Sequence, residues 1–131
     1  MRPRRFSSRG NAAQAERRDA WAAYTADRRW WARRRAWLDS PAANAICPGC
    51  GRVVGERDDV HHLRYPDIPG AEADEDLLLL CRPCHESVHA SLDSWPSWRR
   101  MDRRLATWGV LNALYRNRMK VAHCKGANAG E

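Results

Sequence analysis

The sequence contains no long apolar run. No stretch of its 131 residues approaches the ~20 consecutive apolar residues that a membrane-spanning helix needs. The first ten residues are basic, and they lack the apolar segment of a secretory signal. We therefore expect a soluble, cytoplasmic protein with no membrane partner. The chain length suits a single domain with one modest core.

Proline and glycine are absent between Ala12 and Ser40, where alanine is abundant. The lack of both helix breakers predicts a helix over residues 13–39, and Ser40-Pro41 ends it. At 100° per residue its large apolar side chains fall on one broad arc, which indicates a face that packs in the core. A platform for stacking nucleic-acid bases is the alternative. The residues of this arc are Tyr24, Trp30, Trp31, Trp37 and Leu38.

A second helix is predicted over residues 95–120, because apolar residues recur there every three or four positions. Between the two helices, residues 45–92 contain short β-branched and apolar runs separated by Pro- and Gly-containing turns. Residues 1–12 read as a flexible basic tail and residues 122–131 as a frayed tail. The sequence thus predicts one α+β domain over residues 13–121, mostly helical, with a small central hairpin.

Lysine is scarce, with only two among 23 basic residues, and the charge is unevenly distributed. Residues 1–39 carry a net charge of +7, residues 40–90 of −5 and residues 91–131 of +5. Basic arms suit a polyanion such as DNA, whereas an acidic centre suits a cation. Solvated helix faces are the alternative. The candidate phosphate-binding residues are Arg28, Arg29, Arg33 and Arg35 on the first helix, and Arg99, Arg100, Arg103 and Arg104 on the last.

Four of the five cysteines form two C-x-x-C pairs, Cys47 with Cys50 and Cys81 with Cys84. In a cytoplasmic chain this pattern favours a metal over disulfides. Two such turns can supply the four thiolates of a tetrahedral structural Zn²⁺ site. A redox pair or unrelated buried thiols are the alternatives. His123 and Cys124 have no partner pair, and we interpret them as incidental.

Four of the five histidines lie in or next to the segment between the cysteine pairs. His85 and His89 are four residues apart on a predicted helix, so they share a face and have ligand spacing. His61 and His62 are adjacent, so on a strand they point to opposite sides. One can bind a metal while the other accepts a proton from water near pH 7. The alternative is one larger zinc-binding module without catalysis.

These residues resemble a known family. The string Asp59-Val-His-His-Leu, followed by Leu80-Cys-Arg-Pro-Cys-His-Glu-Ser-Val-His89, is similar to the signature of HNH endonucleases with a zinc knuckle. The resemblance is narrowest to small phage and bacterial HNH proteins, and it covers roughly residues 24–90. It implies a ββα-metal core, in which a β-hairpin packs on a helix with one divalent ion between them.

The resemblance also implies roles for individual residues. His62 would be the general base, and His61, His85 and His89 would hold a catalytic Mg²⁺, Mn²⁺ or Zn²⁺. The reaction would be hydrolysis of a DNA phosphodiester to 5′-phosphate and 3′-hydroxyl ends. Asp76 stands where the family has its central Asn, a residue that orients the base or joins the metal shell. A noncatalytic zinc-dependent DNA- or protein-binding module is the alternative function, and the sequence makes no prediction about the oligomeric state.

Overall fold

A computed structural model describes residues 8–94 and 101–129 of the chain. It combines helices with one small two-stranded sheet, which confirms the predicted α+β class. No helix among the described residues is both long enough and apolar enough to cross a membrane. The elements in chain order are α1 (Ser8–Ala26), α2 (Arg28–Leu38), β1 (Asp59–His62), the short 3₁₀ helix η1 (Asp74–Asp76), β2 (Leu77–Leu80), α3 (Arg82–Ser94) and α5 (Arg103–Ala129).

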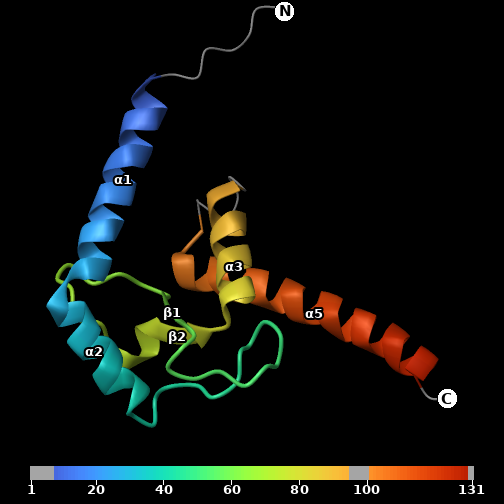
Figure 1. Ribbon diagram of the computed structural model, residues 1–131. Coiled ribbons are helices and arrows are strands. Elements are labelled where there is room, and N and C mark those ends of the chain that lie inside the picture. Colours follow the sequence, from blue (N-terminus) through green and yellow to red (C-terminus); the bar gives the residue numbers. More distant parts are fainter. Residues whose placement is uncertain (1–7, 95–100, 130–131) are drawn as a thin grey trace, which may run out of the picture.

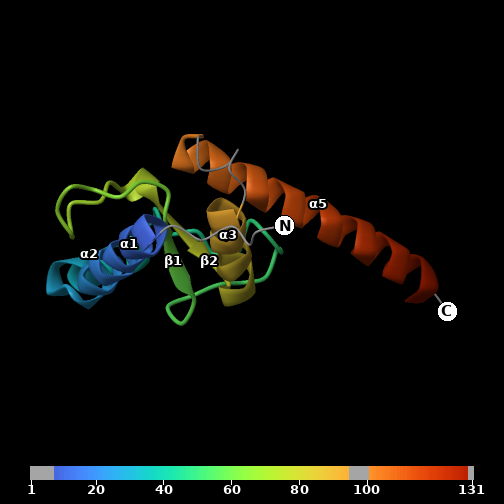
Figure 2. The ribbon, with the colours of Figure 1, turned by 90° about the horizontal axis from the view of Figure 1, so that it is seen from above.

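The two strands form an antiparallel hairpin in the middle of the molecule. Asp59 pairs with Leu80 at one end of the hairpin, and His62 pairs with Leu77 at the other. In both views α1 and α2 lie on one side of this hairpin, and α3 and α5 lie on the other (Figures 1 and 2). Because helices cover both sides of the hairpin, all four leucines of β2 are buried. This explains why the strand is a continuous apolar run and not an alternating one.

The first helical segment is divided in two at Asp27, whereas the sequence predicted one helix over residues 13–39. Asp27 has extended backbone angles (φ −73°, ψ 129°), and its side chain accepts the backbone N–H of Arg29 at 2.8 Å. The aspartate therefore caps α2, an arrangement that a continuous helix would not permit. The turn also changes the predicted aromatic arc, since Trp30 and Trp37 are buried but Trp31 is 52% exposed.

Helix α5 packs on α3 through a face that coincides only in part with the apolar stripe of the sequence, to which Leu105, Trp108 and Leu111 belong. Its buried residues are Ala106, Thr107, Val110 and Leu111, whereas Leu105 and Trp108 on the stripe are exposed. The helix continues to Ala129, beyond the predicted boundary at residue 120. Residues 1–7 of the predicted tail, and Arg99 and Arg100, lie outside the described residues.

Candidate metal centres and the adjoining pocket

The four predicted cysteine ligands lie together in the structure, with all four sulfur atoms within 4.8 Å of one another. The Sγ atom of Cys81 is 3.8 Å from that of Cys47 and 3.6 Å from that of Cys50. A tetrahedral ion with metal–sulfur bonds of ~2.3 Å requires sulfur atoms separated by ~3.8 Å. The cluster therefore has the right size to hold a metal ion.

Local backbone structure brings these sulfur atoms together. The Cys47–Cys50 turn is closed by hydrogen bonds from Cys47 N to Arg52 O and from Gly51 N to Cys47 O, each 2.8 Å long. Gly51 has a φ of +74°, a conformation that favours glycine. The second pair lies at the end of β2 and in the first turn of α3. Burial raises the pKa of the Cys84 thiol, so a bound cation is needed to make this ligand a thiolate.

Asn44 fixes the first cysteine turn against the hairpin. Its side-chain oxygen accepts the N–H of Leu79 at 2.8 Å, and its amide nitrogen donates to the carbonyl oxygens of Leu79 and Ile46. The side chain thus acts as a short extra strand beside β2 and satisfies backbone groups on its open edge. This role could not be predicted from the sequence, because asparagine is common in turns.

A second cluster consists of three histidines, His61 from β1 and His85 and His89 from α3. Their ligand nitrogens lie within 4.8 Å of one another, and the two Nε2 atoms on α3 are 2.9 Å apart. The Nδ1 atom of His61 is buried and has no hydrogen-bond partner in the described part of the chain. A buried nitrogen without a partner is costly unless it binds something. The donor set therefore also fits a metal ion.

Two further residues fix the orientation of these imidazoles. Asp59 Oδ2 lies 3.1 Å from Nδ1 of His85, and Thr107 Oγ1 lies 3.0 Å from Nε2 of His61. These contacts leave His85 Nε2 and His61 Nδ1 available as ligands. Burial lowers the pKa of His61 to about 2 and that of His89 to about 4, so both rings are neutral at pH 7. Neutral imidazole is the form that binds metals.

His62 lies on the other side of β1. Its ring stacks on Tyr65 with centroids 4.6 Å apart, and the centroid of Trp30 is 4.4 Å away. Arg103 donates a hydrogen bond from Nε to the carbonyl oxygen of His62 at 2.7 Å, and its guanidinium lies over the Tyr65 ring. Burial, with the nearby charge of Arg103, lowers the pKa of His62 to about 4. His62 is therefore a neutral, tightly packed imidazole.

A buried glutamate contacts the same histidine. Oε1 of Glu72 is 3.4 Å from Nε2 of His62, and it also accepts hydrogen bonds from the Tyr24 hydroxyl and from Gly70 N. The Glu72 side chain is fully buried. If His62 Nε2–H donates to this carboxylate, Nδ1 carries the lone pair. Sequence reasoning missed Glu72, because it lies in an irregular loop whose path only the fold determines.

Asp76 is placed at the end of the hairpin. Its backbone carbonyl accepts the N–H of Leu63 at 2.7 Å, and its carboxylate pairs with the guanidinium of Arg104. The backbone contact holds the chain directly after His62, and the ion pair joins Asp76 to α5. The residue does not line the pocket described below.

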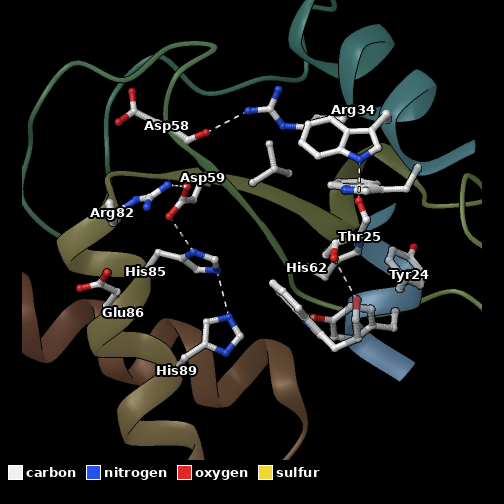
Figure 3. Close-up of a pocket in the computed structure, with 15 residues that line it drawn as sticks. Tyr24, Thr25, Arg34, Asp58, Asp59, His62, Arg82, His85, Glu86 and His89 are labelled. Carbon is white, nitrogen blue, oxygen red and sulfur yellow. Dashed lines mark hydrogen bonds and ion pairs between the residues drawn. The ribbon is translucent and has the colours of Figure 1, made fainter. Parts of the chain in front are cut away.

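The two sides of the site meet at a pocket of about 370 Å³. His85 and His89 extend from α3 on one side, and His62 lies with Tyr24 on the other (Figure 3). Asp59, beside His85, also lines it. A substrate in this pocket would contact two of the candidate metal ligands, His85 and His89, together with the candidate base His62.

Most of the predicted DNA-binding arginines that the structure describes are engaged within the protein. Arg29 pairs with Asp27 at 2.8 Å and Arg35 with Glu56 at 3.1 Å. Arg33 donates to the backbone oxygen of Glu72 and pairs with Asp74, and Arg103 is largely buried beside His62. Arg28 is exposed. The exposed arginines Arg28, Arg29 and Arg35 remain accessible to a phosphate backbone.

Comparison with known families agrees with this geometry. Residues 47–91, which contain both cysteine pairs and the four clustered histidines, match the family model "HNH endonuclease". This match confirms, for residues 47–91, the resemblance to HNH endonucleases inferred from the sequence. No curated protein and no solved structure matched the chain. The match indicates a nuclease-type function with metal binding.

Proposed function

We propose that this protein is a metal-dependent DNA endonuclease that hydrolyses phosphodiester bonds. One observation carries the proposal: three histidines that fit a metal ion lie on one side of β1, and two of them, His85 and His89, border the same pocket as the neutral His62. The HNH family match of the same segment agrees with it. We further infer that residues 13–121 act as one domain.

In this proposal the two clusters have separate tasks. Cys47, Cys50, Cys81 and Cys84 hold a structural Zn²⁺ that stabilises the fold. His61, His85 and His89 hold a divalent Mg²⁺, Mn²⁺ or Zn²⁺. That ion, when bound, supplies Lewis-acid stabilisation of the charge on the phosphate and on the leaving 3′ oxygen.

His62 acts as the general base. Its depressed pKa keeps the imidazole neutral at pH 7, so the proton-accepting form is fully populated. Glu72 fixes the ring through Nε2 and directs the lone pair of Nδ1 away from itself. Nδ1 accepts the proton of the attacking water. Asp76 supports the base indirectly, because its backbone carbonyl accepts the N–H of Leu63 directly after β1, while its carboxylate pairs with Arg104 of α5.

Binding of DNA relies on phosphate contacts from the exposed arginines of α2. Such contacts are independent of sequence and weaken steeply with salt. We expect the logarithm of the affinity for duplex DNA to fall linearly with the logarithm of salt concentration. An affinity that is insensitive to salt would contradict this part of the proposal.

A plasmid-nicking assay tests the enzymatic role. Zinc-loaded protein is incubated with supercoiled plasmid and Mg²⁺, Mn²⁺ or Zn²⁺. We expect nicking by the wild type and a loss of ~10²-fold or more in His62→Ala. The variant must retain the wild-type metal content and melting temperature for the comparison to count. If the folded wild type cuts with none of the ions, the protein is a noncatalytic zinc-dependent binding module instead.

A further inference from the structure

Two half-exposed indole rings line the same pocket as the histidines. Trp21 of α1 is 47% exposed and Trp31 of α2 is 52% exposed. Large aromatic side chains bury most of their area in a core when they serve only to pack. Trp30 and Trp37 do so in this protein, at 4% and 0% exposure. The two exposed rings are thus a distinct feature of the pocket rim.

Both exposed rings are held in place by hydrogen bonds of their own N–H groups. Trp21 Nε1 donates to the Tyr65 hydroxyl at 2.9 Å, and Trp31 Nε1 donates to the backbone oxygen of Thr25. Their polar edges are therefore already satisfied. The flat apolar face of each ring remains available to a ligand, and such a surface is suited to stacking.

A cation supports the second of these rings. The guanidinium carbon of Arg34 lies 5.5 Å from the ring centroid of Trp31, and its NH2 atom donates to the backbone oxygens of Glu56 and Asp58 at 2.9 Å each. These hydrogen bonds to the backbone hold Arg34 over the Trp31 ring. Preorganised aromatic surfaces cost little entropy when they bind a planar ligand.

We propose that this aromatic part of the pocket, formed by Trp21 and Trp31, binds an unpaired nucleobase of the strand whose phosphate lies at the histidines. The inference rests on the proposed nuclease function. The rings and the histidines border one continuous pocket, so a nucleotide at the histidines places its neighbour against the rings. Every base has a stackable face, but in a duplex both faces are already covered. The preferred substrate is therefore single-stranded DNA or the unpaired part of a branched one.

A binding experiment separates stacking from phosphate contact. The full zinc-loaded chain carrying His62→Ala is titrated with a fluorescent oligothymidylate of about 12 nucleotides. A strand of the same length made of abasic sites has the same phosphates without bases. We expect the base-bearing strand to bind about tenfold more tightly than the abasic strand, a ratio within the range that stacking of one base supplies.

Substitutions of Trp31 test whether this residue causes the tighter binding of the base-bearing strand. Trp31→Ala should reduce binding of oligothymidylate about tenfold and leave binding of the abasic strand unchanged, whereas Trp31→Phe should retain most of the affinity. Trp108→Ala is the matched control, because Trp108 is 37% exposed on α5 and does not line the pocket. It should change neither affinity.

Equal affinity for the two strands overturns the proposal, as does a Trp31→Ala variant that behaves like Trp108→Ala. Equal loss of binding to both strands assigns Trp31 to general folding or phosphate contact and also overturns it. The plasmid assay is read separately on the protein without His62→Ala. Because the inferred substrate is unpaired DNA, cleavage is assayed on a single-stranded oligonucleotide as well as on the plasmid. Base-dependent binding without cleavage of either DNA supports the base-binding site and refutes the nuclease, so the two failures are distinguishable.

Discussion

Replacing Gly49 with alanine tests the sulfur cluster without removing any of its ligands. A Cβ atom built at Gly49 would lie 2.8 Å from Sγ of Cys84 and 3.1 Å from Cδ2 of Leu111. Ordinary van der Waals contact begins at 3.4 Å, so the sulfur must move by about 0.6 Å. Both neighbours are buried, at 0% and 1% exposure, and have little room to move.

The required movement is larger than a zinc site tolerates. Metal–ligand distances in such sites stay within ~0.2 Å of their preferred values. We therefore expect Gly49→Ala to lower zinc affinity at least tenfold. Overpacking of this kind also costs ~1–3 kcal/mol in the free energy of unfolding. The zinc loss adds to this cost, because binding of the structural metal is coupled to folding.

The other glycines of this region are matched controls. Gly55→Ala meets no atom within 4 Å and has no positive φ, so its free energy of unfolding should change by less than ~1 kcal/mol. Gly51→Ala also meets no atom, but its φ of +74° should cost ~1–2 kcal/mol without a direct steric effect on the sulfurs. Zinc affinity is measured by competition with a chromogenic chelator, and stability by thermal unfolding. A Gly49→Ala variant with wild-type values for both would refute the packing argument.

Three other variants test individual contacts. Asp59→Asn should lower the metal affinity of the histidine cluster ~10- to 100-fold and leave the sulfur site intact. The neighbouring variant Asp58→Asn should not change this affinity. Titration of each zinc-loaded variant with a second metal measures the affinity. Glu72→Gln should reduce kcat about tenfold or more at unchanged metal content, because the amide oxygen is a weaker hydrogen-bond acceptor than the carboxylate for Nε2–H of His62. Full activity of Glu72→Asp would contradict the requirement that the carboxylate lie at this position. Asn44→Ala should lower the free energy of unfolding by ~1–3 kcal/mol, because it leaves backbone groups of β2 without hydrogen-bond partners. Both metal sites should remain filled. An unchanged denaturant midpoint would contradict this prediction.

Residue spacing predicted the chemistry of the site well. The C-x-x-C pairs indicated a sulfur cluster because a two-residue turn presents both thiols to one side, and the structure brings all four together. His85 and His89 share a helix face for the same kind of reason. These contacts are local or use a repeated motif, so the sequence alone carries the information.

Contacts that depend on the path of loops could not be predicted. Glu72 reaches His62 from an irregular segment, and Thr107 reaches His61 from a helix 46 positions along the chain. Neither glutamate nor threonine occurs here in a sequence motif whose spacing would predict the contact. Asp58, Asp59 and Glu86 all lie close in sequence to the histidine ligands, and only the fold shows that Asp59 contacts His85.

The exposed apolar stripe of α5 shows a different limit. Leu105, Trp108 and Leu111 recur at helical spacing and correctly indicate a helix, but of these three only Leu111 lies on its buried face. The rest of the buried face consists of Ala106, Thr107 and Val110. Periodicity predicts the secondary structure, whereas the choice of face depends on which partner fits.

The central claim is that the chain holds two separate ions, one on sulfur and one on imidazole. Anomalous diffraction at the zinc absorption edge, from crystals of zinc-saturated protein, tests it most directly. The account predicts two peaks, one among Cys47, Cys50, Cys81 and Cys84 and one touching His61, His85 and His89. A single peak on the sulfurs, with the three imidazoles turned away from one another, would contradict it.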